Sequence, residues 1–546
     1  MSARAFTEWW AFRNDRVSAW TFRLRPIPSP TLILLVANIS VKQFFIIPLL
    51  ALVVNVSVAQ NPSGAEVLYN GIALPKEWPP TVSWEDIQAR KPLADPPYLR
   101  SPPALISIDV GRQLFVDDFL IADTTGLTRT YHLAKYHAGN PVFSGGMVFS
   151  DGVWHDPKDH LFKMWYFDHG TGYTTSKDGV HWEPGTNVLS GETDSQTVWL
   201  DLEEKDASKR FKMIRSVIAN NDCRGQIYFS PDGVEWRHMG QTGSWGDRST
   251  FFYNPFRKIW VISVRHGWGQ PRARRYWEVK DLEKGPYWGE ADQPQYPPFW
   301  IGSDSLDLER PDYKIPCELY NLDCVAYESL MLGLFTIWRG QPGPRQKPNE
   351  VCVGFSRDGF HWSRPDRRPF CPVSETPGDW NYANVQSAGG CCLIVGGQLY
   401  FYVSGRGKGR VTSLATLRRD GFASMDGDFF GGTLTTRPVR FSGRYFFVNL
   451  EAPSGGVWIE VFSEDGKRLL TSDRIKGDKT LLPVSWKDAD DLSVLAGKPV
   501  RFRFHLYDGK LYSFWVTPDK SGASHGYVAA GGPGFTGPIN TVGAAR

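Results

Sequence analysis

Hydrophobic and polar residues alternate along many short segments of the chain. The alternation is clear at 113–121, and aromatic-rich runs follow at 162–167, 260–264, 332–338 and 399–405. Successive side chains of a β-strand point to opposite faces, so this pattern predicts short strands with buried faces. We therefore expect an all-β protein, with 113–121 as its first strand.

Five segments repeat one arrangement, in which a polar or acidic residue precedes a short apolar strand, a turn and a second strand. These units open at positions 149, 193, 246, 319 and 381. Strand-rich repeats longer than about 40 residues point to a propeller, with one blade per unit. The repeats predict a five-bladed β-propeller over 110–423, whose inner strands begin together at the mouth of a central channel.

The motif Ser-x-Asp-Gly-x-x-Trp marks the end of three units, at 176–182, 230–236 and 356–362. Asp-Gly favours a turn with positive φ, where the aspartate accepts bonds from backbone amides and serine caps the same corner. The tryptophan is expected to pack between adjacent sheets. We interpret these aspartates as structural and not catalytic.

The segments outside the repeats differ in composition. Residues 424–518 alternate again and contain the turns Asp465-Gly466 and Asp508-Gly509, which predicts a β-sandwich. Residues 61–109 are Pro-rich, as in a linker or surface strap, and 519–546 are rich in Gly and Ala, as in a flexible tail.

The first sixty residues have the pattern of a secretory signal. An apolar run at 44–54 follows Lys42 and ends at Ser57-Val58-Ala59, a plausible cleavage site, which predicts a secreted or periplasmic protein. Because residues 1–40 would make an overlong leader, we hypothesise a true start at Val41. The alternative is an uncleaved membrane anchor within 31–59, although polar residues interrupt that span.

Composition narrows the class of protein. A net charge of only +3, mixed along the chain, excludes a nucleic-acid footprint, while 14% aromatic residues with 22 Trp suit sugar-stacking surfaces. The seven cysteines lack zinc-type spacing and the histidines are scattered, so no metal or cofactor is expected. We expect buried free thiols; a Cys317–Cys324 disulfide is the alternative in an exported protein.

Acidic residues at the unit openings are the candidate catalytic groups. Aligning the units places Asp151, Asp323 and Asn384 at one level, with Asp194 and Asp247 two residues earlier on the same strand face. Converging carboxylates have separated pKa values, which supplies the acid and the base or nucleophile of glycosidic cleavage. The alternative for each aspartate is a strand-capping role.

Other residues extend this candidate site. Glu318 and Glu328 are further acids, and the apolar surroundings of Glu328 indicate either a raised pKa or a structural buried acid. Arginines could pair with the carboxylates or with an acidic substrate, and aromatic rings could stack on sugars, although core packing is the alternative for the tryptophans. These binding candidates are Arg248, Arg265, Trp154, Trp245, Tyr382 and Asn384.

The turn motif, the five acidic openings and the C-terminal sandwich resemble the five-bladed propeller glycoside hydrolases, the glycosyl hydrolase family 32/43-like clan. The resemblance implies that Asp151 is the nucleophile or base and that Asp194 or Asp247 stabilises it. It assigns the proton donor to Asp323, Glu318 or Glu328. The clan's Asn-Asp-Pro-Asn and Glu-Cys motifs are absent, and Asp247-Arg248 matches its Arg-Asp-Pro element only in reverse.

The predicted function is a secreted glycoside hydrolase that cleaves a poly- or oligosaccharide with paired carboxylates at the channel mouth. It is expected to need no cofactor, to bind no nucleic acid and to leave the membrane after signal removal. The alternatives are a non-catalytic glycan-binding propeller, a sialidase-like protein, or a scaffold whose sandwich binds a protein partner.

Overall fold

A computed structural model describes residues 65–191, 193, 195–219, 222–267, 271–290, 292–341, 343, 345, 347–390, 392–407 and 409–543. The segment 1–60, with the expected signal, lies outside these residues. Within the described residues, helical structure is limited to four short pieces: α1 (Trp84–Gln88), α2 (Pro97–Arg100), η1 (Ala207–Lys209) and η2 (Ser493–Leu495). No helix among the described residues has the length and apolar character needed to cross a membrane.

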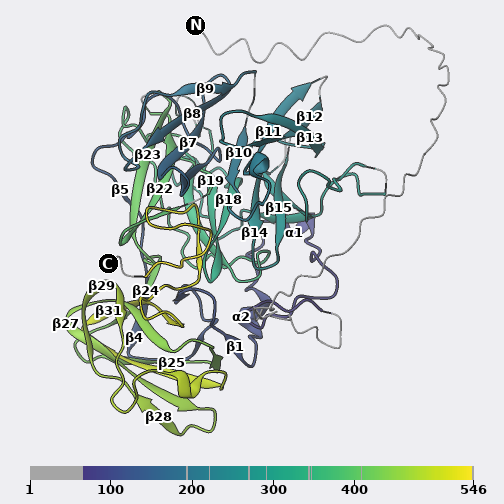
Figure 1. Ribbon diagram of the computed structural model, residues 1–546. Coiled ribbons are helices and arrows are strands. Elements are labelled where there is room, and N and C mark those ends of the chain that lie inside the picture. The colour runs from purple at the N-terminus through teal and green to yellow at the C-terminus, as the bar shows by residue number, and fades with distance from the viewer. Residues whose placement is uncertain are drawn as a thin grey trace, which may run out of the picture. The chain divides into compact units, whose positions relative to one another are not determined.

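Five four-stranded antiparallel sheets form the blades of a propeller, which confirms the predicted fold (Figure 1). Blade one consists of β6 (Val153–Asp156), β7 (Leu161–Phe167), β8 (Thr171–Ser176) and β9 (Thr186–Leu189). Blade two consists of β10 (Gln196–Leu200), β11 (Phe211–Ala219), β12 (Asp222–Ser230) and β13 (Arg237–Ser244). Blade three consists of β14 (Thr250–Asn254), β15 (Ile259–His266), β16 (Ala273–Val279) and β17 (Phe299–Gly302).

Blades four and five recruit strands from distant parts of the chain. Blade four contains β18 (Glu318–Glu328), β19 (Leu330–Trp338), β20 (Glu350–Ser356) and β32 (Tyr527–Val528). Blade five contains β21 (Leu393–Val395), β22 (Gln398–Gly405), β23 (Val411–Arg418) and β5 (Lys135–Tyr136). Because β5 precedes the first blade and pairs with β23 of the last, it closes the ring. Blades one and five also touch through the Ser150 amide, which donates to the Ser387 carbonyl.

The three repeated turns have the predicted structural role. In the first, Asp178 accepts from the backbone amides of Val180 and His181 at 2.8 Å, and Ser176 accepts from Gly179, whose φ is +77°. The other two turns repeat these bonds. Aromatic side chains of neighbouring blades donate to each turn: Tyr402 to Gly179, Trp165 to Gly233, and Trp300 to Phe360.

Residues 424–518 contribute to one 12-stranded curled sheet rather than an isolated C-terminal unit. It combines β1 (Ile106–Ser107), β2 (Gln113–Leu114), β3 (Ile121–Thr125), β4 (Leu127–Tyr131), β24 (Ala423–Gly427), β25 (Gly432–Thr436), β26 (Val439–Arg440), β27 (Tyr445–Ser463), β28 (Arg468–Thr471), β29 (Ile475–Pro483), β30 (Val500–Tyr507) and β31 (Gly509–Thr517).

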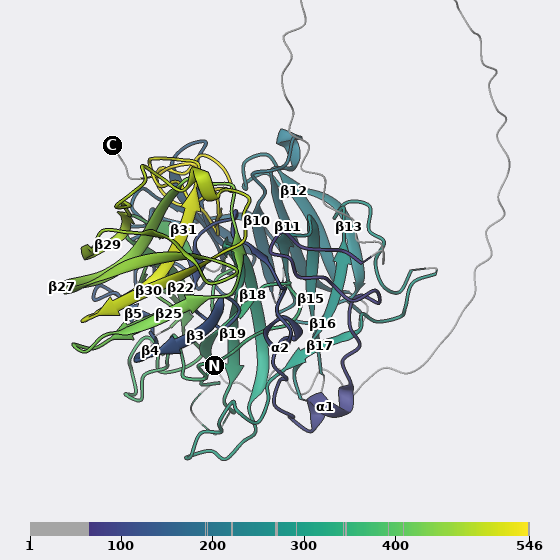
Figure 2. The ribbon, with the colours of Figure 1, turned by 90° about the horizontal axis from the view of Figure 1, so that it is seen from below.

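The long strand β27 bends this sheet around its own apolar core. It pairs with β31 along its first part and with β30 along its second, and the three strands lie side by side in Figure 2. Strands β1–β4 lie before the first blade in sequence yet pair here, so the propeller starts at β5 and not at residue 110. Alternation predicted strands in this region, but it carries no information on their pairing partners.

The segment 519–543, expected to be a flexible tail, runs beside the inner strand of blade four. Tyr527 and Val528 pair with Glu328 and Tyr327, and the Ala530 amide donates to the Cys392 carbonyl. Val528 and Ala530 are buried. Small side chains let this segment fit against the blade, which its composition alone did not distinguish from a loose tail.

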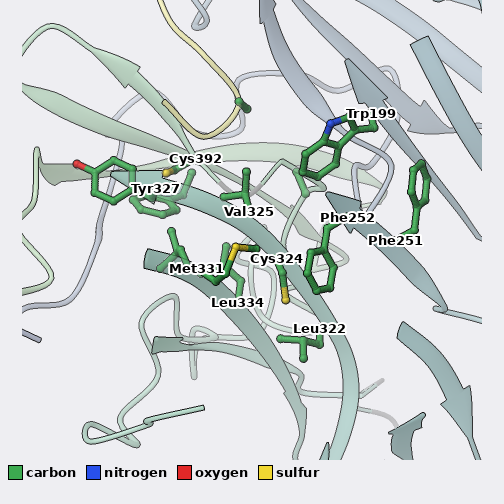
Figure 3. Packing of buried hydrophobic residues seen from close by; sticks show 14 of the residues in the cluster. Trp199, Phe251, Phe252, Leu322, Cys324, Val325, Tyr327, Met331, Leu334 and Cys392 are labelled. Carbon is green, nitrogen blue, oxygen red and sulfur yellow. The ribbon is translucent and has the colours of Figure 1, made fainter. Parts of the chain in front are cut away.

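The propeller core lies between the blades. Figure 3 shows Leu322, Cys324 and Val325 of β18 near Phe252 of β14 and Trp199 of β10. The cysteines among the described residues are free thiols, Cys317 and Cys324 included, which confirms the expectation of unpaired cysteines there.

Candidate active site

One of the predicted carboxylates, Asp323, belongs to a hydrogen-bond network that joins blades one, four and five, and a second, Asp151, is the chain neighbour of a member. Asp151 lies two residues before β6, and Asp323 lies in the middle of β18. Asn321 donates to the Ser150 hydroxyl at 3.1 Å and to Asp323 Oδ2 at 2.9 Å, while the Ser387 hydroxyl donates to the same oxygen. The Asp151 carboxyl group itself accepts from the Phe149 amide.

Burial dominates the acidity of both groups. It raises the pKa of Asp151 to about 7, against the opposing effects of the Phe149 amide, Gln196 and Arg248. It also raises the pKa of Asp323 to about 6, although Ser387 and Ser150 act in the opposite direction. Among the described residues, none donates a hydrogen bond to Oδ1 of either group. Both carboxyl groups are therefore harder to ionise than an ordinary aspartate.

Phe149 contacts Asp151 through its backbone and two arginines through its ring. Its amide donates to Asp151 Oδ2 at 2.8 Å, and its ring lies 3.7 Å from the Arg248 guanidinium and 5.7 Å from that of Arg406. Phe149 is 1% exposed and Asp151 0%. The sequence led us to expect a carboxylate open to the channel; instead it is buried, and Ser150 before it has a positive φ of 63°.

Tyr320 is a candidate residue that the sequence did not indicate. The Lys347 ammonium donates to its hydroxyl at 3.3 Å, and the Arg272 guanidinium lies 5.4 Å from its ring. Burial raises the pKa of Tyr320, but Arg248 and Lys347 outweigh it and bring the pKa below its usual value. A register shift between Leu319 and Asn321 re-aims Tyr320 relative to plain alternation.

Two other predicted acids form ion pairs near the openings of their inner strands. Asp247, three residues before β14, pairs with Arg265, and Glu318, at the start of β18, pairs with Arg272. Their side chains are 26% and 18% exposed, so both are open to a ligand in a way that Asp151 and Asp323 are not. Their exposure and their ion pairs suit contacts with a bound ligand.

Glu328 belongs to a different place. It ends β18, at the opposite end from Glu318, and its fully buried carboxylate pairs with Arg112 and Arg419. Ser524 donates to it at 2.6 Å. Of the two expectations for Glu328, these partners favour the structural buried acid. Asp194 lies outside the described residues.

Among the predicted binding residues, the two tryptophans are buried in the core, whereas Tyr382 is partly exposed. Trp154 and Trp245 are buried in the core, at 3% and 4% exposure, and Trp154 lines a cavity of about 50 Å³, too small for a sugar ring. Tyr382 is half-buried with the Arg345 guanidinium 4.5 Å from its ring. Asn384 is buried and accepts from Asn349 and Gln386. The tryptophans thus have the structural role that was the alternative for them.

No protein-family model and no curated protein matches the sequence. Solved structures that are similar include a glycosyl hydrolase from Bacteroides ovatus (12% identity, 53% of this chain and 94% of that one, TM-score 0.35) and a fructofuranosidase from Schwanniomyces occidentalis complexed with fructosylnystose (11%, 70% and 96%, 0.31). A third is an N-acetylgalactosamine deacetylase from F. plautii (12%, 55% and 97%, 0.37). At such TM-scores the likeness transfers neither an activity nor a site to this chain.

Proposed function

We propose that this protein is a glycoside hydrolase whose active site is the channel mouth of its five-bladed propeller. One observation carries the proposal: Asp323 shares a hydrogen-bond network with Ser150, the chain neighbour of Asp151, and both carboxyl groups are buried with raised pKa values. Glycosidic cleavage needs one carboxyl group that donates a proton and one that stays an anion.

The two carboxyl groups would take different roles. Asp151, whose raised pKa keeps it protonated in mildly acidic solution, would donate its proton to the glycosidic oxygen as the bond to the anomeric carbon breaks. Asp323 would act on the anomeric carbon as nucleophile or through a water from which it takes a proton. This is the reverse of the assignment that the family resemblance implied.

Substrate access requires a local movement, because Asp151 and Asp323 are 0% and 2% exposed. We propose that the Phe149 ring, which is buried beside Arg248 and Arg406, is the group that moves. The ion-paired Asp247 and Glu318, with Lys347, would then hold sugar hydroxyls at the mouth, because charged groups make strong hydrogen bonds. A substrate that displaces the ring would itself supply the free energy for the movement.

The test replaces each member of the pair. Asp151→Asn and Asp323→Asn should each lose most turnover on the aryl glycosides or polysaccharides that the wild type cleaves, with sugar binding retained. The exposed Asp95→Asn is the matched control and should cleave normally. A wild-type protein inactive on a broad panel of aryl glycosides and plant or algal polysaccharides, or active Asp151→Asn and Asp323→Asn variants, would contradict the proposal.

A second candidate is a glycan-binding propeller without catalysis. Its support is the burial of Asp151 and Asp323, at 0% and 2% exposure, which also suits a structural polar cluster. It predicts sugar binding by the wild type with no turnover on any substrate, and the same binding in both Asn variants.

We also propose that the protein is exported through the segment ending at Ala59. N-terminal sequencing of the mature protein should find Gln60 first. A mature chain that begins at or before residue 31 would contradict this.

A further inference from the structure

The curled sheet has an open groove away from the propeller channel. It lies where β4, β24 and β31 run side by side, and its volume is about 460 Å³. This is within the range of small-molecule sites, about 300–1,000 Å³. Its polar side chains include both hydrogen-bond donors and acceptors: Thr128, Thr130, Asp426, Glu451, Asp508 and Lys510.

Two aromatic side chains that follow a groove residue in sequence are exposed to solvent. Phe429 and Phe430 are 83% and 92% exposed, and both follow Asp428, which lines the groove. Their ring centres are 6.0 Å apart in an edge-to-face arrangement. Exposing two adjacent rings forfeits hydrophobic stabilisation of about 1.5–3 kcal/mol for each, which makes a binding role the better explanation.

The turn that carries the rings is ordered. Asp428 Oδ1 accepts from the amides of Phe430 and Gly431 at 2.9 and 3.1 Å, and the Asp508 amide donates to the Asp428 carbonyl at 2.7 Å. These bonds hold the backbone that carries the rings next to Asp428, which lines the groove. A preorganised site loses less entropy when it binds a ligand.

The groove chemistry selects among ligands. Carboxylates accept hydrogen bonds from hydroxyl groups, and the hydroxyls of Thr128 and Thr130 can do either. Four carboxylates lie on the groove with one ammonium, from Lys510, which disfavours an anionic polymer or an anionic lipid surface. A protein partner would need a larger continuous apolar patch than two rings beside a polar floor.

We propose that this groove is a second carbohydrate-binding site, which takes a short segment of a neutral polysaccharide with Phe429 and Phe430 as its stacking surface. The proposal rests on the proposed function only in its choice of carbohydrate. A second site of this kind would keep the enzyme on a polymeric substrate between cleavages, because linked sites raise the effective concentration of the chain.

The test is affinity electrophoresis of the full chain in gels that contain a neutral glucan, xylan or galactomannan, with alginate as the anionic comparison. The Asp323→Asn variant is the starting protein, so that cleavage does not alter the gel. We expect at least one neutral polymer to retard it several-fold and alginate not to do so.

Adding Phe429→Ala and Phe430→Ala should abolish that retardation, and adding Asp508→Asn should weaken it. Leu308→Ala, which changes a 74% exposed side chain elsewhere, is the matched control and should change nothing. Retardation by no neutral polymer, or unchanged retardation after removal of both rings, would overturn the inference. Retardation that depends on the rings, in a protein whose wild type cleaves nothing, would support this site while the proposed hydrolase activity fails.

Discussion

In single residues of the propeller, burial and neighbouring charges shift the pKa of a side chain in opposite directions. The hydroxyls of Tyr327 and Tyr402 are deeply buried, and burial raises their pKa values well above the usual range. Tyr320 is buried as well, yet its pKa is lowered, because the cations of Arg248 and Lys347 stabilise its phenolate form. In Asp151 the effect of burial exceeds that of the neighbouring Arg248 cation and the hydrogen bonds, so its pKa rises to about 7.

The raised pKa of Asp151 has a consequence for stability. The unfolded chain releases this proton near the ordinary value of 3.8 and the folded protein only near 7, so stability falls as the pH rises between these values. Above pH 7 the full cost of about 4 kcal/mol remains, at about 1.4 kcal/mol per pKa unit. Asp151→Asn carries no such cost and should melt several degrees above the wild type at pH 8, but close to it at pH 4.

Thermal unfolding at both pH values measures this difference. Asp95→Asn, on an exposed side chain, should match the wild type at each pH. If Asp151→Asn shifts the melting temperature equally at pH 4 and pH 8, the carboxyl group is not protonated in the fold, and its assignment as proton donor fails as well.

The environment of Tyr320 can be read by ultraviolet difference titration. The titratable groups that face it are Arg248 and Asp247 from the segment before β14, Lys347, and Arg272 with its partner Glu318. The folded wild type should show one tyrosine that ionises below the ordinary pKa of about 10. Tyr320→Phe should remove this step and Lys347→Met should move it upward, because an ammonium that stabilises the phenolate is lost. Tyr382→Phe should leave it in place; four identical curves would contradict the assignment.

The sequence could single out Asp151 and Asp323 as candidates because both follow from aligning repeated unit openings. It could not single out Tyr320, which depends on a one-residue register shift in β18. Nor could it show that Asp151 and Phe149 are buried, because that depends on the packing of several blades.

Among the elements, the Asp-Gly turns join the blades to one another. Gly233 has φ +85°, and a Cβ atom there would lie 2.4 Å from Cζ2 of Trp165, whose indole donates to the Gly233 carbonyl. Gly233→Ala should therefore destabilise the fold by about 2–5 kcal/mol, from backbone strain and overpacking together.

Gly240 in β13 is the matched control, because a Cβ atom there would meet nothing within 4 Å. Gly240→Ala should change stability by less than about 0.5 kcal/mol. Chemical denaturation of both variants measures the difference. Equal stability of Gly233→Ala and Gly240→Ala would mean that the turn can open without disturbing the packing between blades.

Elements that pair over long sequence distances were the least predictable. Alternation indicates that 113–121 and 135–136 are extended, but nothing in those residues names β31 or β23 as the partner. The pairing of β32 with β18 is a further case, since two residues of a Gly-rich segment carry no periodic signal. The repeat pattern could predict the number of blades because each blade is a local unit, whereas closure of the ring is not local.

For the molecule as a whole, a buried network of charges joins the propeller to the curled sheet. Arg112, between β1 and β2, donates to Asp420 after β23 at 2.9 Å and pairs with Glu328 of β18. Arg419 also pairs with Glu328, at 2.9 Å. Asn449 of β27 and Ser513 of β31 both donate to Asp420. These side chains are almost completely buried, so each charge depends on its partners for compensation.

Glu328→Gln keeps the shape of this network and removes one of its charges. The arginine side chains of Arg112 and Arg419 then lose a buried counter-charge, which costs about 3–5 kcal/mol when one partner of a buried pair is removed. Glu318→Gln is the matched control: its ion pair with Arg272 is partly exposed, and its loss should cost about 1 kcal/mol or less. Because Glu328 ends β18 far from Asp151, turnover per folded molecule should be unchanged. A Glu328→Gln variant with wild-type melting temperature and no turnover would return Glu328 to the active site, and calorimetry together with an activity assay on one preparation distinguishes the two roles.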